Sequence, residues 1–410
     1  MQRPIITLLF LLLYWAANAT EITVCKNCPI NSIEKAIEMA HVGDIIKIKT
    51  GLYKVNNIEI NKRLIIEGEK NTVLDGDFKN QIITITSSGV VIKGLTIQNS
   101  GKSDLKDIAG IKLLKVSNCI LRDNIFINDF FGIYLSESSS CQVINNKIKG
   151  NAVTETSSGN GIHLWKCEHM TIAGNRIEQH RDGIYFEFVK HSNITGNYST
   201  HNLRYGLHFM FSDGNVYEKN TFTENGAGVA VMYTKNIRMS ENIFKNNWGA
   251  ASYGLLLKDI TNSVIVNNTF SKNTTGIYME GINKLFVTSN RFEDNGWAMK
   301  IMGNCENDTL KKNSFTGNSF DVSTNSSGNA NYFDGNYWDK YQGYDLNKDK
   351  IGDVPFRPVD LFSMIVDEIP SAIMLLRSFL VDVLNKAEKA VPAFIPESLI
   401  DNHPLMQPIR

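Results

Sequence analysis

Short segments of alternating apolar and polar residues recur through the middle of the chain, and most of them begin at a glycine. The first and third residues after the glycine are apolar, as in Ile162 and Leu164 or Ile184 and Phe186. Side chains alternate across a β-strand, so these positions face a core and the second and fourth positions face outward. The glycines in phase are Gly110, Gly132, Gly161, Gly183, Gly206, Gly228, Gly254 and Gly276. The pattern therefore predicts one strand that is repeated many times.

Asparagines recur in phase with these strands, at steps of 22, 29, 22, 23, 22, 26, 22 and 23 residues. A fixed period of this size indicates stacked repeats rather than one globular core. It fits one coil of a parallel β-helix, and the leucine-rich repeat signature is absent. We expect the asparagine amides to bond to one another and to turn backbone, which is a structural role. The series is Asn124, Asn146, Asn175, Asn197, Asn220, Asn242, Asn268, Asn290 and Asn313.

The two ends of the chain depart from this repeat. Residues 20–60 are predicted to form an N-terminal cap that includes a short amphipathic helix beginning after Ser32. Residues 61–335 are the predicted β-helix, with coils of about 22 residues. Residues 336–410 comprise an aromatic loop and a helical tail. The predicted fold is thus an all-β solenoid with a capping helix at one end and helices at the other.

Residues 1–19 are typical of a secretory signal peptide. Arg3 supplies the positive charge, the segment from Ile5 to Ala17 is apolar except for Thr7, and Ala17 and Ala19 fit the small-residue cleavage pattern. We therefore expect Sec-dependent export to an extracytoplasmic compartment. The formal net charge is zero, which gives no reason to expect a nucleic-acid partner.

Six cysteines in an exported chain allow disulfides. Cys25 and Cys28 are close in sequence, and a small structural disulfide is the main prediction, with a metal pair or free thiols as alternatives. Cys119 and Cys141 each lie five residues before an asparagine of the series, so stacking would place them about 4.8 Å apart. That spacing permits a disulfide, and two small buried apolar side chains are an equal alternative.

The outward positions of the repeat carry unusual side chains. Met210 and Met232 fall at the same position of neighbouring coils, and His208 lies two residues before Met210. Thioether and imidazole ligands suit soft Cu(I), so these three residues are candidate copper ligands. Trp165 and Glu187 occupy equivalent outward positions and are candidate partner-binding residues. A face covered by inserts or by the tail, with methionine as apolar filler, and a catalytic face remain alternatives.

A short acidic loop near the C-terminus resembles the start of a calcium loop. Oxygen-bearing side chains stand at its first, third, fifth and ninth positions. The usual turn glycine and the final bidentate glutamate are absent, so a hydrogen-bonded turn competes with a calcium site. The candidate ligands are Asp345, Asn347, Asp349 and Asp353.

Polysaccharide lyases, hydrolases and epimerases form an alternative functional class, because β-helices often act on polysaccharides. Asp182, Glu187, Arg181 and Arg204 could line a cleft. No pair of carboxylates stacks at the outward positions of neighbouring coils, however, and glycoside hydrolysis requires such a pair. A solenoid that binds carbohydrate without catalysis is a third alternative.

Residues 359–390 are predicted to form one or two amphipathic helices. These helices could cap the end of the solenoid, or their apolar face could be a docking surface. The candidate docking residues are Phe362, Met364, Leu375, Leu376 and Phe379.

Several runs of residues resemble the NosD family. The most specific is the run at 202–212, which reads Asn-Leu-Arg-Tyr-Gly-Leu-His-Phe-Met-Phe-Ser. The runs at 181–188, 231–235, 336–339, 352–358 and 359–362 resemble the same family, so the resemblance covers nearly the whole chain after the signal segment. Within it, His208 and Met210 stand at family-motif positions, whereas Met232 rests on the stacking argument.

The resemblance implies a right-handed β-helix located in the periplasm and held at the membrane through partners. It implies a non-enzymatic accessory role in assembling the copper–sulfur centre of nitrous oxide reductase. The implied partners are an ABC transporter permease with its ATPase, the reductase, and a small copper-chaperone lipoprotein. The implied cargo is copper, bound transiently as Cu(I). The calcium-like loop is less acidic than the family pattern.

Overall fold

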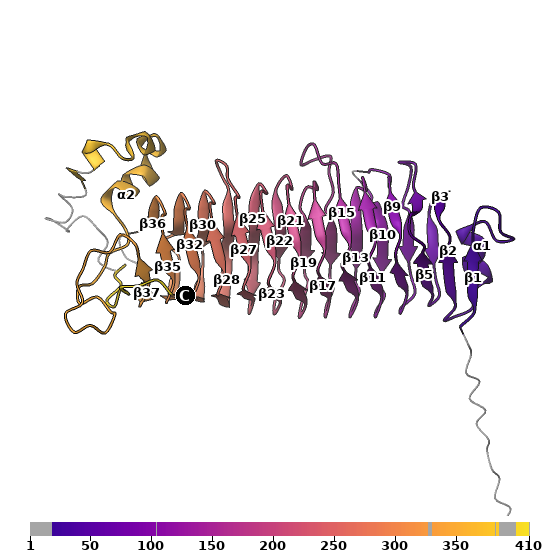
Figure 1. The fold of residues 1–410 in the computed structure, drawn as a ribbon, viewed down its shortest axis with the longest axis horizontal. Coiled ribbons are helices and arrows are strands. Elements are labelled where there is room, and N and C mark those ends of the chain that lie inside the picture. The colour runs from indigo at the N-terminus through magenta and orange to yellow at the C-terminus, as the bar shows by residue number, and fades with distance from the viewer. Residues whose placement is uncertain (1–18, 104, 327–329, 382, 385–398, 410) are drawn as a thin grey trace, which may run out of the picture.

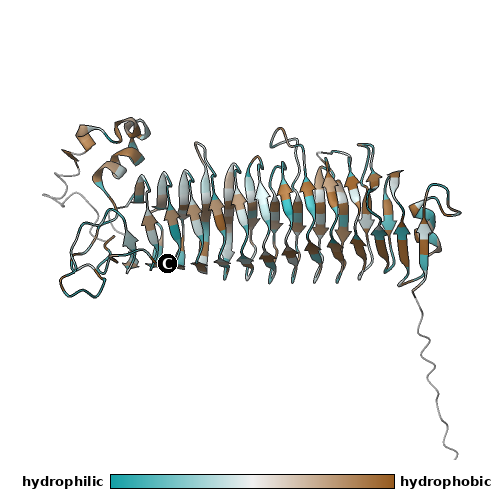
Figure 2. Cartoon of the chain, viewed as in Figure 1, coloured by the Kyte–Doolittle hydropathy of each residue, from teal (hydrophilic) through white to brown (hydrophobic). Residues whose placement is uncertain are grey.

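The chain forms an elongated right-handed parallel β-helix of about 14 turns, as the sequence predicts (Figure 1). The structure is a computed structural model, and it describes residues 19–103, 105–326, 330–381, 383–384 and 399–409. The predicted signal peptide therefore lies almost wholly outside the described residues. Hydrophobic and hydrophilic residues alternate along the strands of the coils (Figure 2).

Each regular coil contributes three short strands, and equivalent strands of successive coils pair in parallel. Stack A contains the strands with the apolar alternation: β4 (Ile58–Ile60), β7 (Ile83–Ile85), β10 (Ala109–Leu114), β13 (Phe131–Ser136), β16 (Ile162–Trp165), β19 (Ile184–Glu187), β22 (Tyr205–Met210), β25 (Ala227–Lys235), β28 (Tyr253–Val266), β30 (Thr275–Glu280), β33 (Trp297–Ile301) and β36 (Phe320–Ser323). Its residues carry the candidate site.

Stack B follows stack A in each coil. Its strands are β1 (Glu21–Val24), β2 (Ile45–Ile48), β5 (Ile65–Gly68), β8 (Val91–Lys93), β11 (Ile120–Arg122), β14 (Gln142–Ile144), β17 (Thr171–Ala173), β20 (Asn193–Thr195), β23 (Val216–Glu218), β26 (Arg238–Ser240), β31 (Asn283–Thr288), β34 (Glu306–Lys311) and β37 (Ala330–Asp334). The long strand β28 pairs with both stacks and joins them into one sheet.

Stack C completes each coil and forms the second sheet. Its strands are β3 (Gly51–Lys54), β6 (Thr72–Asp75), β9 (Thr96–Gln98), β12 (Ile125–Ile127), β15 (Lys147–Lys149), β18 (Arg176–Glu178), β21 (Tyr198–Thr200), β24 (Thr221–Thr223), β27 (Ile243–Lys245), β29 (Thr269–Ser271), β32 (Arg291–Glu293), β35 (Ser314–Thr316) and β38 (Tyr337–Trp338).

The predicted asparagine series forms a buried ladder at the corner between stacks B and C. Asn220 is typical: its Nδ2 donates to Ile194 O at 2.8 Å and to Asn242 Oδ1 at 3.0 Å, and its Oδ1 accepts from Asn197 N at 2.9 Å. A second ladder, which was not predicted from the sequence, lies five residues after the first, between stacks C and A. Its members are Asn202, Asn225, Asn247, Asn273, Asn295 and Asn318.

Aromatic rings fill the core beside the first ladder. The rings lie two residues after successive ladder asparagines and stack with centroids 4.1 to 5.6 Å apart. They are Phe222, Phe244, Phe270, Phe292, Phe315 and Trp338. The sequence spacing that sets the hydrogen-bonded corner therefore also sets the packing of the core.

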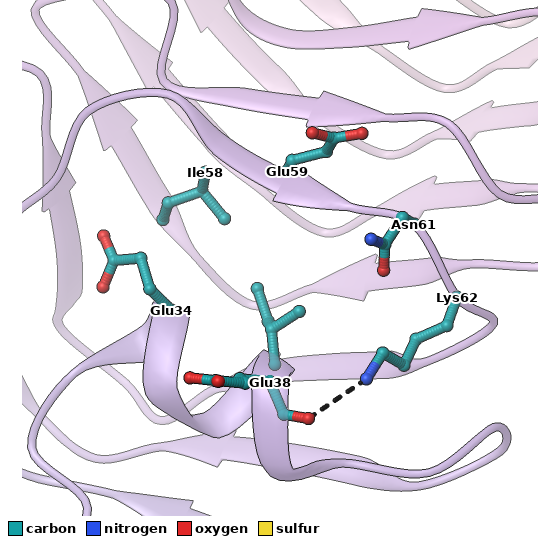
Figure 3. A pocket seen from close by; sticks show the side chains of 7 residues that line it. Glu34, Glu38, Ile58, Glu59, Asn61 and Lys62 are labelled. Carbon is teal, nitrogen blue, oxygen red and sulfur yellow. Dashed lines mark hydrogen bonds between the residues drawn. The ribbon is translucent and has the colours of Figure 1, made fainter.

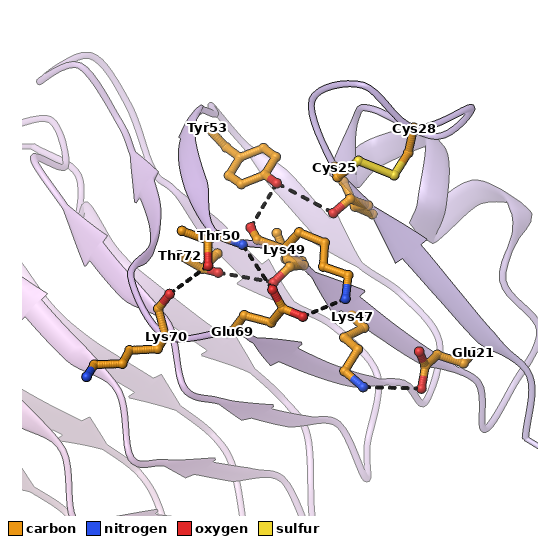
Figure 4. A network of polar contacts seen from close by, with 12 residues as sticks. Glu21, Cys25, Cys28, Lys47, Lys49, Thr50, Tyr53, Glu69, Lys70 and Thr72 are labelled. Carbon is orange, nitrogen blue, oxygen red and sulfur yellow. Dashed lines mark hydrogen bonds and ion pairs between the residues drawn. A yellow bond between two sulfur atoms is a disulfide. The ribbon is translucent and has the colours of Figure 1, made fainter.

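The N-terminal end of the solenoid is covered by α1 (Ile33–Met39), in which Ser32 accepts a hydrogen bond from Lys35 N as the predicted helix cap. A disulfide joins Cys25 to Cys28 beside it, and Lys49 pairs with Glu69 at 2.6 Å on the adjoining coils (Figure 4). The disulfide agrees with the main prediction for this cysteine pair.

Cys119 and Cys141 are buried free thiols in adjacent coils, with Cys119 N donating to Cys141 Sγ at 3.4 Å. Of the two alternatives drawn from the sequence, the structure has the small buried side chains rather than the disulfide.

The C-terminal end is closed by the last residues of the chain, which return to the solenoid. Asp401 bridges in parallel to Phe333, and Leu405 to Tyr337, so this segment adds a partial coil. Buried Asp401 takes the place of the next ladder asparagine: its Oδ2 accepts from Asn336 N at 2.9 Å and from Asn336 Nδ2 at 3.0 Å.

The helical tail is an excursion between the last regular coil and this returning segment. It contains α2 (Leu361–Glu368) and the 3-10 helix η1 (Pro370–Leu375), and it lies beside the orange end of the solenoid (Figure 1). Lys300 Nζ donates to Asp367 Oδ1 at 2.6 Å, which ties α2 to β33. None of the helices that the structure describes is long and apolar enough to span a membrane.

Candidate functional site

Met210 and Met232 lie side by side on stack A, as the coil alignment predicts. They are register partners, Met210 as the last residue of β22 and Met232 within β25, and each is half-buried. Glu187 precedes them in the same row, and Lys258 follows them. Two thioethers are thus held on adjacent strands at a partly open surface, where a soft cation could reach both sulfur atoms.

His208 does not lie on the open surface, which corrects the expectation from strand alternation. It is on the outward side of β22, but only 4% of the residue is exposed. The ring of Tyr205 lies 4.9 Å from it and the ring of Tyr185 lies 5.1 Å from it. Alternation assigns a side chain to a face of the sheet, but it does not show that neighbouring aromatic rings cover that face.

His208 is the end of a column of rings along the outer face of stack A. Tyr134 stacks on His163 at 4.7 Å, and His163 stacks on Tyr185 at 4.7 Å. Burial, together with the charges of Arg181 and Lys112, lowers the pKa of His163 to about 3, so this imidazole is neutral. The sequence already contains the pattern that aligns this column of rings, because each ring occupies the second position after a repeat glycine.

A cluster of charges surrounds Asp182, which is fully buried just before β19. Asp182 Oδ2 lies 3.7 Å from Arg181 Nε and 3.8 Å from His208 Nδ1. Asp182 Oδ1 lies 3.7 Å from Arg204 Nε. These distances exceed a normal hydrogen bond. Asp182 Oδ2, Arg181 Nε and both ring nitrogens of His208 have no hydrogen-bond partner among the described residues.

The remaining surface candidates on this face are also partly covered. Trp165 and Glu187 are half-buried, and Lys166 Nζ lies 4.3 Å above the Trp165 ring. Glu187 neighbours Trp165 in one direction and Met210 in the other. Together they form a row that leads to the methionine pair.

The calcium-like loop is folded as a hydrogen-bonded turn. Asp345 Oδ2 accepts from Lys350 N at 2.9 Å, and Asp349 Oδ1 accepts from Ile351 N at 2.8 Å. Asn347 Oδ1 accepts from Asp349 N at 3.1 Å, and Asp353 Oδ2 accepts from Leu346 N at 2.7 Å. The oxygens that a cation would need are bonded to the loop's own backbone, so calcium binding stays a prediction.

The helical tail divides its predicted docking residues between a packed side and an open side. Phe362 is 2% exposed and packs with Trp297 and Phe320, which removes it from the docking surface. Met364 is half-buried against the main core, and Leu376 packs on the Phe362 cluster. Leu375 and Phe379 are 41% and 83% exposed. The brown colouring of this segment in Figure 2 shows its apolar character.

A pocket lies far from these groups, at the N-terminal end of the solenoid. Its volume is about 340 Å³, and α1 and β4 line it (Figure 3). Lys62 Nζ donates to Ala40 O at 2.9 Å on its rim.

Across the described part of the chain, no group of three or more His, Cys, Asp or Glu side chains could hold a metal ion.

The chain matches a family model described as "Periplasmic copper-binding protein (NosD)" over residues 144–343. Two curated relatives are both named "Probable ABC transporter binding protein NosD". The one from Pseudomonas aeruginosa is 29% identical over 371 residues, covering 86% of each chain. The one from Stutzerimonas stutzeri is 28% identical over 382 residues, covering 88% of this chain and 86% of the relative. The matched segment includes His208, Met210 and Met232.

Solved structures with the same fold include the A-module of the mannuronan C-5 epimerase AlgE6 from Azotobacter vinelandii. Its TM-score is 0.60 at 13% identity, covering 76% of this chain and 95% of that one. The catalytic domain of a GH87 α-1,3-glucanase has a TM-score of 0.54 at 13% identity, covering 78% and 69%. At these identities the likeness establishes the β-helix fold alone.

Proposed function

We propose that this chain is a NosD-type periplasmic accessory protein that handles copper for an ABC transporter system, because it matches the NosD family model and is similar to two curated NosD proteins over most of its length. In this proposal the chain works with a permease and its ATPase, receives Cu(I) from a small lipoprotein chaperone and docks nitrous oxide reductase during assembly of its copper–sulfur centre. The relatives' names describe transporter-binding proteins, which supports a role without catalysis.

The observation that carries the copper role is the pairing of Met210 with Met232. A parallel strand pair holds equivalent side chains about 4.8 Å apart, and both residues are half-buried rather than enclosed. Thioether sulfur favours Cu(I) over the harder cations. Two ligands leave the ion incompletely coordinated, so a donor chain can supply further ligands and withdraw them again. Incomplete coordination of this kind suits transfer rather than storage.

His208 takes a secondary place in this proposal. Its ring nitrogens are unbonded within the described structure, but the rings of Tyr185 and Tyr205 cover it. The imidazole can join the two thioethers only if the covering rings move. We therefore assign initial Cu(I) capture to the methionine pair and treat His208 as a ligand that would complete the site afterwards.

The test is a Cu(I) competition titration against a chromophoric chelator. Replacing Met210 and Met232 together by leucine keeps side-chain volume and removes both sulfur atoms. We expect the Cu(I) affinity to fall by about tenfold or more, because one lost soft ligand is worth at least ~1.4 kcal/mol. The matched control is Met39→Leu, since Met39 is exposed on α1. Equal Cu(I) affinity in the double variant and the control would remove the ligand assignment.

A further inference from the structure

We propose that Arg181 and Arg204 form a binding site for a carboxylate on an acidic segment of a partner protein, and that Glu155 of this chain occupies the site until the partner arrives. Glu155 lies in the 151–160 insert, where the asparagine series takes its longest step. The proposal concerns different residues from the methionine pair and holds whether or not copper binds there.

The site is built around a charge that the fold itself buries. Asp182 is fully buried between the two arginines, with 3.7 Å to Arg181 Nε and 3.7 Å to Arg204 Nε. In both ion pairs the close contact with Asp182 is made through Nε. The arginine side chains are 28% and 30% exposed, so both are partly open to solvent and to a ligand.

The two arginines carry more positive charge than the buried carboxylate of Asp182 can balance. Two guanidinium groups face one buried carboxylate, which leaves one positive charge without a close partner from the solenoid wall. Glu155 supplies the missing charge from the insert, at 3.8 Å from Arg204 Nε, but its side chain is 63% exposed. An exposed ion pair of this length contributes little stability, about 0–1 kcal/mol. An external carboxylate can therefore displace Glu155 at small cost.

The chemistry of the ligand follows from the donors. The planar fork of an arginine matches the two oxygens of a carboxylate, which a lysine ammonium does not. A sugar acid would also present a carboxylate, but sugar rings bind by stacking on open aromatic faces. Here the faces are already occupied, because Arg204 lies 4.9 Å over the Tyr205 ring and His163 stacks on Tyr185. The arrangement therefore favours an acidic peptide over a uronate chain.

The experiment measures binding of a fluorescein-labelled tetraglutamate peptide to the full-length protein by fluorescence anisotropy at low ionic strength. Glu155→Gln should tighten binding about threefold or more, since it removes the internal competitor. Arg181→Lys keeps the positive charge but loses the fork, and should weaken binding about threefold or more. Glu155 lies in an exposed insert, so its variant tests the proposal even if Arg181→Lys destabilises the protein.

Glu168→Gln is the control for nonspecific attraction. It removes the same charge from an exposed glutamate in the next turn of the same coil. Equal peptide affinity in the Glu155 and Glu168 variants would overturn the proposal. A tetragalacturonate oligosaccharide provides the comparison between ligand classes. Tighter binding of this oligosaccharide than of the peptide, again dependent on Glu155, would replace the protein partner with a glycan.

Discussion

Each ladder asparagine links three coils through one buried amide. The carbonyl oxygen accepts from the coil before, and the amino group donates both to that coil's backbone and to the asparagine of the next coil. Buried polar groups must be paired because an unsatisfied group costs about 1–3 kcal/mol. The ladder therefore supplies hydrogen-bond partners to the backbone N–H and C=O groups at the corners of the coils, which the strands leave unpaired.

Replacing Asn220 by alanine should be strongly destabilising. The change leaves Asn197 N and Ile194 O without their side-chain partners and opens a gap beside Asn242. We expect the free energy of unfolding to fall by about 3 kcal/mol, measured by urea denaturation. Asn61→Ala is the control, because Asn61 is exposed and should change stability by less than about 0.5 kcal/mol. A similar small effect at Asn220 would show that the ladder is dispensable.

His180 provides a pH-dependent test of the interior. Burial lowers its pKa to about 4, so the folded protein holds this imidazole neutral while the unfolded chain protonates near 6.5. A depressed pKa contributes stability above the unfolded value, and that stability is lost as pH falls from about 6.5 to 4. His180→Asn should therefore lose less stability than the wild type between pH 7.5 and 5.

The measurement compares urea midpoints at the two pH values. Exposed His191→Asn serves as the control and should retain the full acid sensitivity. The buried carboxyls with raised pKa act in the opposite direction, but they are common to all three proteins and cancel in the comparison. Identical pH dependence in the wild type and the His180 variant would contradict the assignment.

Among the elements, the returning C-terminal segment has the clearest mechanical role. Open β-solenoid ends expose unpaired strand edges, which favour aggregation unless they are covered. Asp401 ends the ladder because its carboxylate accepts hydrogen bonds and donates none. Its Oδ2 accepts from Asn336 N and from Trp338 Nε1, and its Oδ1 accepts from Gly335 N and His403 N. A carboxylate suits this position because every neighbour is a donor.

Asp401→Asn should loosen the C-terminal end while leaving the other coils intact. One oxygen becomes an amino group that faces two or more donors, which we expect to cost about 1–3 kcal/mol. Limited proteolysis should then cut the C-terminal region faster than in the wild type. Asp259→Asn, at an exposed position of β28, is the matched control. Unchanged protection in Asp401→Asn would mean that the segment is held by its apolar contacts alone.

At the scale of the whole molecule, the helical tail projects an apolar surface from a closed rod. Both ends of the excursion are anchored, by Lys300–Asp367 at α2 and by Asp401 at the returning segment. Ile373, Met374 and Phe379 remain open at 46%, 86% and 83% exposure. Exposed apolar clusters on folded proteins mark interaction sites. We propose that this surface binds the transporter permease.

Replacing Phe379 by glutamate should reduce co-purification with the permease by about tenfold or more, since an aromatic anchor that becomes buried in an interface typically contributes about 2 kcal/mol. Ser371→Glu, on an exposed and polar position nearby, introduces the same charge and should have little effect. Equal recovery of the permease with both variants would place the docking surface elsewhere. The Cu(I) affinity of the methionine pair should be unchanged in either variant, because the pair lies on β22 and β25.

The repeating residues determined most of the fold. A glycine, two alternating apolar residues and an asparagine at a fixed step set the coil length, the inward faces and the register of Met210 with Met232. The reason is physical: in a solenoid each coil contacts only its neighbours, so local periodicity specifies the packing. The second asparagine ladder was available from the same spacing, five residues after the first.

The tertiary structure decided which outward residues are open. His208 and Phe362 follow outward or amphipathic patterns, yet both are buried: Tyr185 and Tyr205 cover His208, and Trp297 and Phe320 pack on Phe362. The closure of the solenoid by Asp401 and the approach of Glu155 from its insert to Arg204 also join residues that no local period relates. Periodicity specifies which face of the sheet a side chain takes and which rings align on it. The inserts and the tail are nonrepeating, and how closely they and the neighbouring rings cover that face is decided only by the folded chain.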